Sequence, residues 1–506
     1  MRAECTLKPI FVAGATGYVG GRLVPRLLER GYQVRALVRA PEKIEGRSWG
    51  THPNLHIFKG DVLDRTSMTQ ALRGCRAAFY LIHSMSPEVS DFSSTDRIAA
   101  QNMTQAAASA GLEQIIYLGG LGEENPELSH HLRSRAEVGQ ILHQGSVPVT
   151  ILRAAMIIGS GSASFEMLRY LVDRLPIIIA PRKVDTPCQP IGIRNVIYYL
   201  IGCLEHPEVI GETFDIGQPE VTNYCELMRI YAEEAGLPRR RIVQLPFLSA
   251  RISAYWIHFI TPISVSLARP LAQGLKNPVV CRENRITTII PQELHDARIA
   301  IRRALMRTRQ LEVETAWSDS GELPPVEWST EGDPDWAGGS MFEDARRVVL
   351  DATPEQIWPS ITSVGGDTGY YYANWLWKIR GFMDQLFGGF GLLRGRRSSK
   401  VLHPGDAIDF WRVVQVRRLH TLVLSAEMKL PGEAALLFRL KPADDGRTEV
   451  QQIARFLPKG LLGLAYWYSV MPFHHFVFNG MLRGVALSTG APLLQGPEHF
   501  DASTQE

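Results

Sequence analysis

Three glycines near the N-terminus have the spacing of a phosphate-binding turn. The segment reads Gly14-Ala15-Thr16-Gly17-Tyr18-Val19-Gly20 and stands between an apolar run and a segment of helical periodicity. In such a turn the first glycine permits the tight bend, the second lets the backbone approach a pyrophosphate, and the third lets helix and strand pack closely. The N-terminus of the helix adds N–H donors and a favourable dipole for phosphates. The segment therefore predicts a dinucleotide-binding site.

The residue that follows the second expected strand indicates which dinucleotide would bind. A cofactor with a free ribose 2′-hydroxyl usually meets an Asp or Glu at this position. Here Arg39 occupies it, which suits a 2′-phosphate and favours NADP(H) over NAD(H). The alternative, that Arg39 is a solvated surface charge, stays open.

Short apolar runs alternate with helical segments from residue 9 to residue 217. Strands that alternate with helices form parallel sheets covered on both faces, so the pattern predicts an α/β fold with a doubly wound parallel Rossmann sheet. The segment 222–234 and the apolar region 242–308 are typical of a helical extension, which places this domain at residues 8–309. We expect strands at 10–13, 33–38, 55–58, 77–82, 114–118 and 149–153.

Several of these segments together resemble one protein family. The glycine turn, Asp61-Val62, the strand end 80–84 and residues 152–154 are similar to atypical short-chain dehydrogenase/reductases, with the NmrA-like and complex-I-accessory branches nearest. The resemblance covers about residues 9–309. It implies that Asp61 and Val62 flank the adenine of the cofactor, and that the strand ends line its path, with contacts from Leu81, Ile82, His83 and Leu118.

The catalytic residues that this resemblance would imply are missing. Working members usually carry Ser, Tyr and Lys, with the Lys lowering the Tyr pKa so that it acts as a general acid. In the matching helix His131 stands in the place of Tyr and Arg135 in that of Lys, and Gly119-Gly120 stand where Ser is expected. Either His131 donates a proton and Arg135 holds a ribose or phosphate, or the site binds cofactor without proton transfer.

A second domain follows a change in composition. Residues 318–340 are rich in Gly, Pro, Ser and acid, so we expect a linker at 310–340. Apolar and polar residues then alternate with period two, and a long apolar segment, 460–488, closes the domain. Residues 341–490 resemble a domain of unknown function found behind NAD(P)-binding domains, and their order of elements resembles the START-like helix-grip fold. The expected class is an α+β antiparallel domain, with a tail at 491–506.

The START-like resemblance implies an apolar ligand between the sheet and the last helix, a small apolar or lipid-like molecule. We expect that helix to lay Leu464, Tyr468 and Met471 against the sheet. Three charged residues fall among strand residues, where an unpaired buried charge is costly. These residues are Asp409, Arg412 and Glu427. They form either an internal ion pair or polar anchors for a ligand.

Composition excludes several classes of protein. The 506 residues carry a net charge of +2, without the basic excess that tracks nucleic acid. The six cysteines form no C-x-x-C pair and no Cys/His cluster has zinc spacing, so we expect no metal site and a reducing, cytoplasmic location. Two apolar stretches, 252–268 and 461–478, contain proline or histidine and are typical of buried or interfacial helices, which leaves contact with a membrane surface open.

Two functions follow from these features. The first is an oxidoreductase that uses NADP(H) to reduce an apolar or quinone-like substrate. The second is a non-catalytic NAD(P)H sensor or assembly protein whose C-terminal domain binds a hydrophobic ligand or partner. The sequence does not indicate an oligomeric state.

Overall fold

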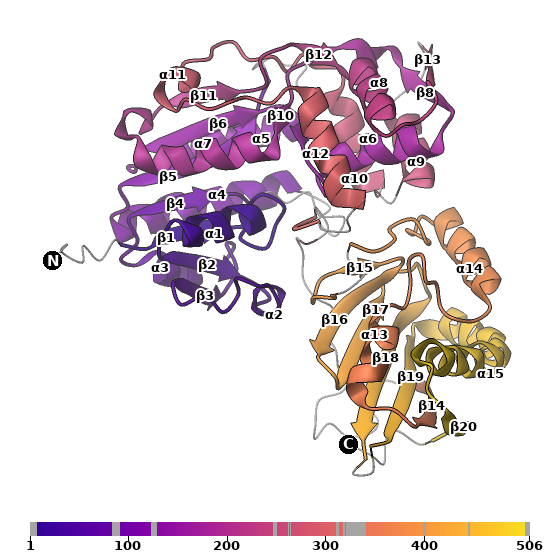
Figure 1. Ribbon diagram of the computed structural model, residues 1–506. Coiled ribbons are helices and arrows are strands. Elements are labelled where there is room, and N and C mark those ends of the chain that lie inside the picture. Colours follow the sequence, from indigo (N-terminus) through magenta and orange to yellow (C-terminus); the bar gives the residue numbers. More distant parts are fainter. Residues whose placement is uncertain are drawn as a thin grey trace. The chain divides into compact units, whose positions relative to one another are not determined.

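The computed structural model describes residues 8–82, 92–122, 129–245, 250–261, 263, 265–309, 313–316, 319, 341–397, 401–443 and 446–500. The chain divides into two compact units, Met1–Glu322 and Leu323–Glu506. The first is a sheet covered by helices on both faces, and the second is a sheet packed against a long helix (Figure 1).

The first unit is built on a seven-stranded parallel sheet, as predicted. Helices α1 (Gly20–Glu29) and α7 (Ile193–Glu205) pack on one face, while α3 (Arg65–Leu72), α4 (Phe92–Ala110) and α5 (His130–His143) pack on the other. The strands are buried on both faces, which explains their continuous apolar runs. In spatial order they are β11 (Thr213–Ile216), β6 (Val149–Ala154), β5 (Gln114–Gly120), β4 (Ala77–Tyr80), β1 (Ile10–Ala13), β2 (Val34–Val38) and β3 (Leu55–Lys59).

An extension of helices and short strand pairs packs beside this sheet. Its core joins α6, α8 and α12 through residues such as Phe165, Tyr231 and Ile301, all almost fully buried. The short helix α2 (Glu42–Glu45) belongs to the sheet domain. The other helices of this unit are α6 (Ala163–Arg174), α8 (Tyr224–Glu234), α9 (Ala250–Ile260), α10 (Val265–Gly274), α11 (Ile286–Ile289) and α12 (Ala297–Arg309). The strand pairs are β7 (Ile157–Ile158) with β10 (Ile191–Gly192), β8 (Ile177–Pro181) with β13 (Arg241–Leu245), and β9 (Pro187–Cys188) with β12 (Thr222–Asn223).

The second unit contains a seven-stranded antiparallel sheet, which agrees with the predicted α+β antiparallel fold class. Helices α13 (Pro354–Thr362) and α15 (Gly460–Thr489) pack on one face of this sheet. Helix α14 (Asn374–Leu386) follows α13 in the sequence. The strands in spatial order are β15 (Ala407–Ile408), β16 (Trp411–Arg417), β17 (Thr421–Ala426), β18 (Gly432–Pro442), β19 (Thr448–Pro458), β14 (Phe342–Leu350) and β20 (Leu493–His499).

The last helix buries a different stripe from the one expected. Its second half packs on the sheet through Phe478, Met481 and Leu482, whereas Tyr468 is 65% and Met471 41% exposed. The prediction was wrong because the helix is apolar on every side, so periodicity alone does not identify the buried face.

Two expected boundaries also change. Thr315 and Asp319 fall in the expected linker, yet they pack on the first unit: the Thr315 hydroxyl donates to the Tyr18 carbonyl at 2.7 Å, and Arg47 pairs with Asp319 at 3.3 Å. Most of the remaining linker lies outside the described residues. The expected tail contains β20, which pairs antiparallel with β14 and completes the second sheet.

Candidate functional site

A cleft of about 480 Å³ opens at the carboxyl edge of the parallel sheet. The ends of β1 to β6 all contribute to its walls, together with α5, α8 and α10. This is the edge at which open α/β sheets bind ligands, because the loops that follow the strands diverge there.

The glycine turn forms one end of the cleft, and its three glycines have different roles. A Cβ on Gly14, where φ is +89°, would lie 2.8 Å from the Leu81 carbonyl oxygen, and one on Gly20 would lie 2.1 Å from the Gly14 oxygen. A Cβ on Gly17 would meet nothing nearer than 3.4 Å. Gly14 and Gly20 are thus required by the turn itself, whereas Gly17 leaves its surroundings open on the cleft side, as a site for a pyrophosphate requires.

Most of the predicted cofactor residues line this one cleft. Ala15 does not: its side chain is fully buried in the core beneath the turn. His83 lies outside the described residues. Those that line the cleft are Gly14, Thr16, Gly17, Tyr18, Val19, Gly20, Arg39, Asp61, Val62, Leu81, Ile82 and Leu118.

The turn after β3 is held by contacts that the sequence did not reveal. The Asp61 carboxylate accepts a hydrogen bond from the Leu63 amide at 2.9 Å. The Asn102 side-chain amide, on α4, donates to the carbonyls of Val62 at 3.0 Å and Leu63 at 2.9 Å. Asn102 therefore fixes the wall expected to flank the adenine without itself lining the cleft.

His131 and Arg135 both line the cleft, one turn apart on α5. The Ser129 hydroxyl caps this helix by accepting from the Leu132 amide at 3.5 Å. The Arg135 guanidinium donates to the Leu118 carbonyl at 2.9 Å, which ties α5 to the end of β5. Within the described lining His131 is the one imidazole, so it is the residue best suited to proton transfer near neutral pH.

At Gly120, where a serine would be expected, α5 packs closely against the end of β5. A Cβ on Gly120 would lie 3.0 Å from a Leu132 methyl carbon and 3.1 Å from Arg135 Cδ. Neighbouring Tyr117 does not replace the missing tyrosine, because burial raises its pKa to about 12 and its hydroxyl donates to the Arg135 carbonyl at 3.1 Å. Among the described residues that line the cleft, His131 therefore stays the candidate for proton transfer.

Part of the cleft lining is apolar. It includes Leu121 and Met156, which follow β5 and β6, and Pro270 and Leu271 of α10, with Tyr224 of α8 beside them in the lining. Burial raises the pKa of Tyr224, so its hydroxyl stays protonated. The apolar stretch 252–268, interpreted as a buried or interfacial helix, ends just before Pro270 and Leu271, so the sequence did not indicate this apolar lining.

The three charged residues considered as ligand anchors in the second unit have protein partners. The Arg412 guanidinium donates to the Glu427 carboxylate at 2.9 Å, and Arg394 also pairs with Glu427. Burial opposes ionisation of Glu427, but Arg412 and Arg394 outweigh it and lower its pKa to about 2. Asp409 accepts from the Tyr370 hydroxyl and the Gly366 amide, each at 3.0 Å. These contacts favour the internal ion-pair interpretation.

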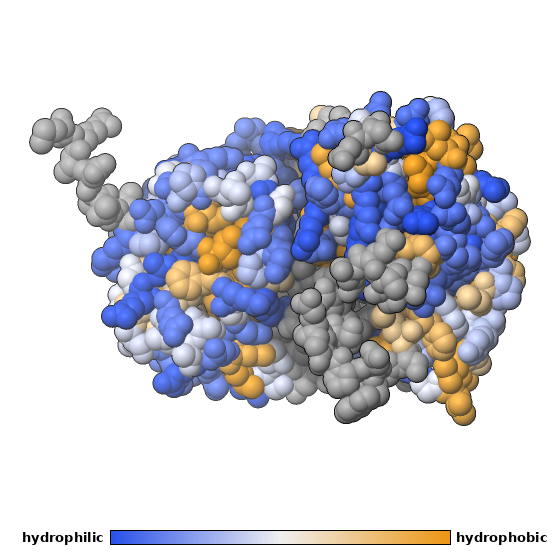
Figure 2. Space-filling view, turned by 90° about the horizontal axis from the view of Figure 1, so that it is seen from below, coloured by the Kyte–Doolittle hydropathy of each residue, from blue (hydrophilic) through white to orange (hydrophobic). Residues whose placement is uncertain are grey.

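The second unit also exposes an apolar helix face. The outer side of α14 presents large apolar residues at helical spacing, and the first half of α15 presents several more. Hydrophobic surface is gathered in separate patches in the view of Figure 2. None of the described helices is both long enough and apolar enough to span a membrane. The exposed residues are Trp375, Ile379, Phe382, Met383, Leu386 and Phe387, and Leu461, Leu462, Tyr468, Met471, Phe473 and Phe476.

Comparisons with known proteins agree with this division. Residues 14–167 match a family described as NAD(P)H-binding, and residues 336–481 match DUF2867, a family of unknown function. The chain therefore combines a Rossmann-type NAD(P)H-binding domain with a separate C-terminal DUF2867 domain.

Individual relatives are similar over part of the chain. Cinnamoyl-CoA reductase 1 of Petunia hybrida is 29% identical over 117 residues, which are 22% of this chain and 35% of the relative. A putative dihydroflavonol 4-reductase of Synechocystis is 37% identical over 120 residues, 23% of this chain and 32% of the relative. The chain thus spans about a third of the length of these relatives. The triphenylmethane reductase of Citrobacter is 18% identical with a TM-score of 0.48, covering 59% of this chain and 99% of that structure.

Proposed function

We propose that the protein is an NADPH-dependent reductase of an apolar, quinone-like substrate. The observation that carries this proposal is that one cleft joins the glycine turn, Arg39 and His131 to an apolar wall from α10. The curated relatives that bear the name reductase support the same class of reaction.

Each part of the cleft has a role in this proposal. The backbone around Gly17 and the N-terminus of α1 hold the pyrophosphate, and Arg39 pairs with the 2′-phosphate. Bound NADPH supplies a hydride. His131 holds the proton that the reduced oxygen requires. Arg135 keeps its charge and its bond to the Leu118 carbonyl, so it positions α5 and does not exchange protons.

The test is NADPH oxidation against a panel of quinones and aromatic carbonyl compounds. We expect at least one quinone to consume NADPH in proportion to product. The His131→Gln variant should lower kcat while leaving the NADPH Kd unchanged, because the imidazole is proposed to act on the substrate oxygen. Tight NADPH binding without oxidation by any member of the panel would refute the reductase proposal.

Tight NADPH binding without oxidation would support the second candidate, an NAD(P)H sensor or assembly protein. The absence of the Ser-Tyr-Lys set favours it, since His131 and Arg135 cannot reproduce the Tyr-Lys couple in which a lysine lowers a phenol pKa. In this case cofactor binding would change the protection of α5 in hydrogen exchange without any turnover.

We propose further that the exposed face of α14 and α15 contacts a lipid surface. A helix with aromatic and aliphatic residues on its outer side and a cation beside them is typical of interfacial helices, and the exposed Lys378 lies on α14 next to this face. Vesicles that contain anionic lipid should carry the protein to the top of a flotation gradient, and the Ile379→Glu/Phe382→Glu variant should stay below. If both proteins behave alike, the lipid contact is wrong.

A further inference from the structure

A small cavity of about 50 Å³ lies beside the cofactor cleft of the first unit. Helices α6, α8, α9 and α10 and strand β8 supply most of its lining. The described lining contains no charged side chain, and only three hydroxyl groups and the Trp256 indole interrupt an apolar surface. Such a cavity takes hydrocarbon more readily than a polar group, because a buried polar group without a partner is costly.

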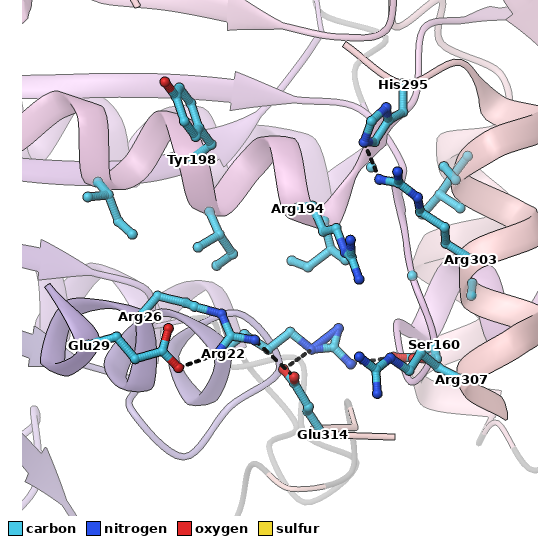
Figure 3. Close-up of a pocket in the computed structure, with 18 of the residues that line it drawn as sticks. Arg22, Arg26, Glu29, Ser160, Arg194, Tyr198, His295, Arg303, Arg307 and Glu314 are labelled. Carbon is cyan, nitrogen blue, oxygen red and sulfur yellow. Dashed lines mark hydrogen bonds and ion pairs between the residues drawn. The ribbon is translucent and has the colours of Figure 1, made fainter. Parts of the chain in front are cut away.

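The position of this small cavity distinguishes it from a larger one in the same unit. The larger cavity, of about 560 Å³, lies between α1, α7 and α12, and arginines line much of it (Figure 3). No described residue lines both the larger cavity and the cofactor cleft. The small cavity, in contrast, shares Ser164 and Tyr224 with the cleft. These two side chains therefore mark the boundary at which the cleft adjoins the small cavity.

Helix α10 forms a wall of both the cofactor cleft and the small cavity. Pro270 and Leu271 line the cleft, whereas Ala272 and Leu275 line the small cavity. Gly274 also lines the cleft, and a Cβ added to it would meet nothing within 4 Å, so the end of this helix leaves open space. The apolar part of the cleft lining thus continues along α10 into the small cavity.

The other end of the small cavity reaches the surface of the unit. Two of its lining residues, Ile179 of β8 and Trp256 of α9, are 40% and 37% exposed. Val243 of β13 pairs with Ile179 and is also exposed, as are Tyr255 and Phe259 of α9. The small cavity therefore lies between the cofactor cleft and an exposed apolar face that β8, β13 and α9 build.

We propose that the small cavity holds the hydrocarbon side chain of a substrate whose ring lies in the cofactor cleft. The place of the ring rests on the reductase function proposed above, whereas the site of the side chain rests on the cavity. A group the size of a water molecule requires about 10–15 Å³, so the cavity of about 50 Å³ accommodates roughly three methylene groups. The rest of a longer chain lies on the exposed apolar face. The substrate class is thus narrowed to quinones that carry a long hydrocarbon side chain.

The test compares a benzoquinone without a side chain with the same quinone carrying an n-decyl chain. Each is titrated calorimetrically into the full-length protein saturated with NADP⁺, so that binding is measured without turnover. Each buried methylene group strengthens binding about fourfold, so the decyl compound should bind at least tenfold more tightly. NADPH oxidation by each quinone is measured separately, because it reports the reductase function.

Substitutions at Ser253 separate filling of the small cavity from other effects. The Ser253 hydroxyl is buried and has no hydrogen-bond partner in the described part of the chain, so its removal breaks no hydrogen bond. Ser253→Leu fills the cavity and should abolish the advantage of the decyl chain, while the quinone without a chain binds as before. The matched control, Ser253→Ala, removes the hydroxyl without filling the space and should keep the advantage. Ala272→Leu fills the cavity from α10 and should act as Ser253→Leu does; thermal unfolding checks the fold of each variant.

Two results would overturn the side-chain site. One is equal affinity of the wild type for the two quinones, and the other is a decyl advantage that survives both Leu substitutions. A decyl advantage that the Leu substitutions remove, without NADPH oxidation by either quinone, would refute the reductase function and leave the hydrocarbon site in place. Oxidation of both quinones with equal affinities would do the reverse, and binding of neither quinone would overturn both proposals.

Discussion

The Gly17→Ala variant separates a cofactor-binding turn from a merely structural one. Gly14 and Gly20 do not permit this test, since a Cβ at either position would collide with backbone atoms. At Gly17 the nearest atom to an added Cβ is the Gly14 oxygen at 3.4 Å, an ordinary contact, and φ is not positive. The variant should therefore fold with a stability within about 0.5 kcal/mol of the wild type.

Binding of NADPH should respond quite differently. The added methyl group occupies the side from which a pyrophosphate approaches the backbone, and it weakens at least one charge-assisted hydrogen bond, worth about 1.5–3 kcal/mol. At 1.4 kcal/mol per factor of ten, the dissociation constant should rise roughly 10- to 100-fold. Titration of NADPH fluorescence measures this change, and thermal unfolding checks the fold.

The Gly20→Ala variant is the contrasting case. Its Cβ would lie 2.1 Å from the Gly14 oxygen, so it should lower the stability as well as the affinity. If Gly17→Ala bound NADPH as tightly as the wild type does, the open space at Gly17 would not be where the pyrophosphate lies, and the assignment of the cleft would be wrong.

Two further predictions follow from the charges. Replacing Arg39 by Asp should weaken NADPH at least tenfold more than NADH, measured by parallel titrations, because only NADPH carries the 2′-phosphate; equal losses would contradict the assignment. Replacing Glu427 by Gln should lower the free energy of unfolding by about 2–3 kcal/mol at pH 7, because the Glu427 pKa falls from an ordinary 4.5 to about 2 in the folded protein. This stabilisation is present above pH 4.5 and is lost as the pH falls toward 2. The free energies of unfolding of the wild type and the variant, measured by urea titration, should therefore converge near pH 2. A difference that stays constant with pH would refute the ion-pair explanation. The exposed Glu433→Gln should cost less than 1 kcal/mol.

The parts of the structure that the sequence predicted well depend on local patterns. The strands of the first sheet are buried on both faces, so each appears as an apolar run, and the glycine turn identifies the edge at which the other strand ends converge. Arg39 could be placed at this edge for that reason, whereas Asp61 and Leu118 were expected from the family resemblance; all three line the cleft. The START-like resemblance remains unconfirmed, although the order of the elements agrees with it.

The features that were missed depend on contacts distant in sequence. Strand β20 follows a helix and contains Gly496-Pro497, so nothing in its own residues indicates that it pairs with β14. No helix was predicted at the position of α14, so its exposed apolar face was missed as well. Asn102 holds the turn after β3 from 40 residues away, and a lone Asn within a helix gives no such indication.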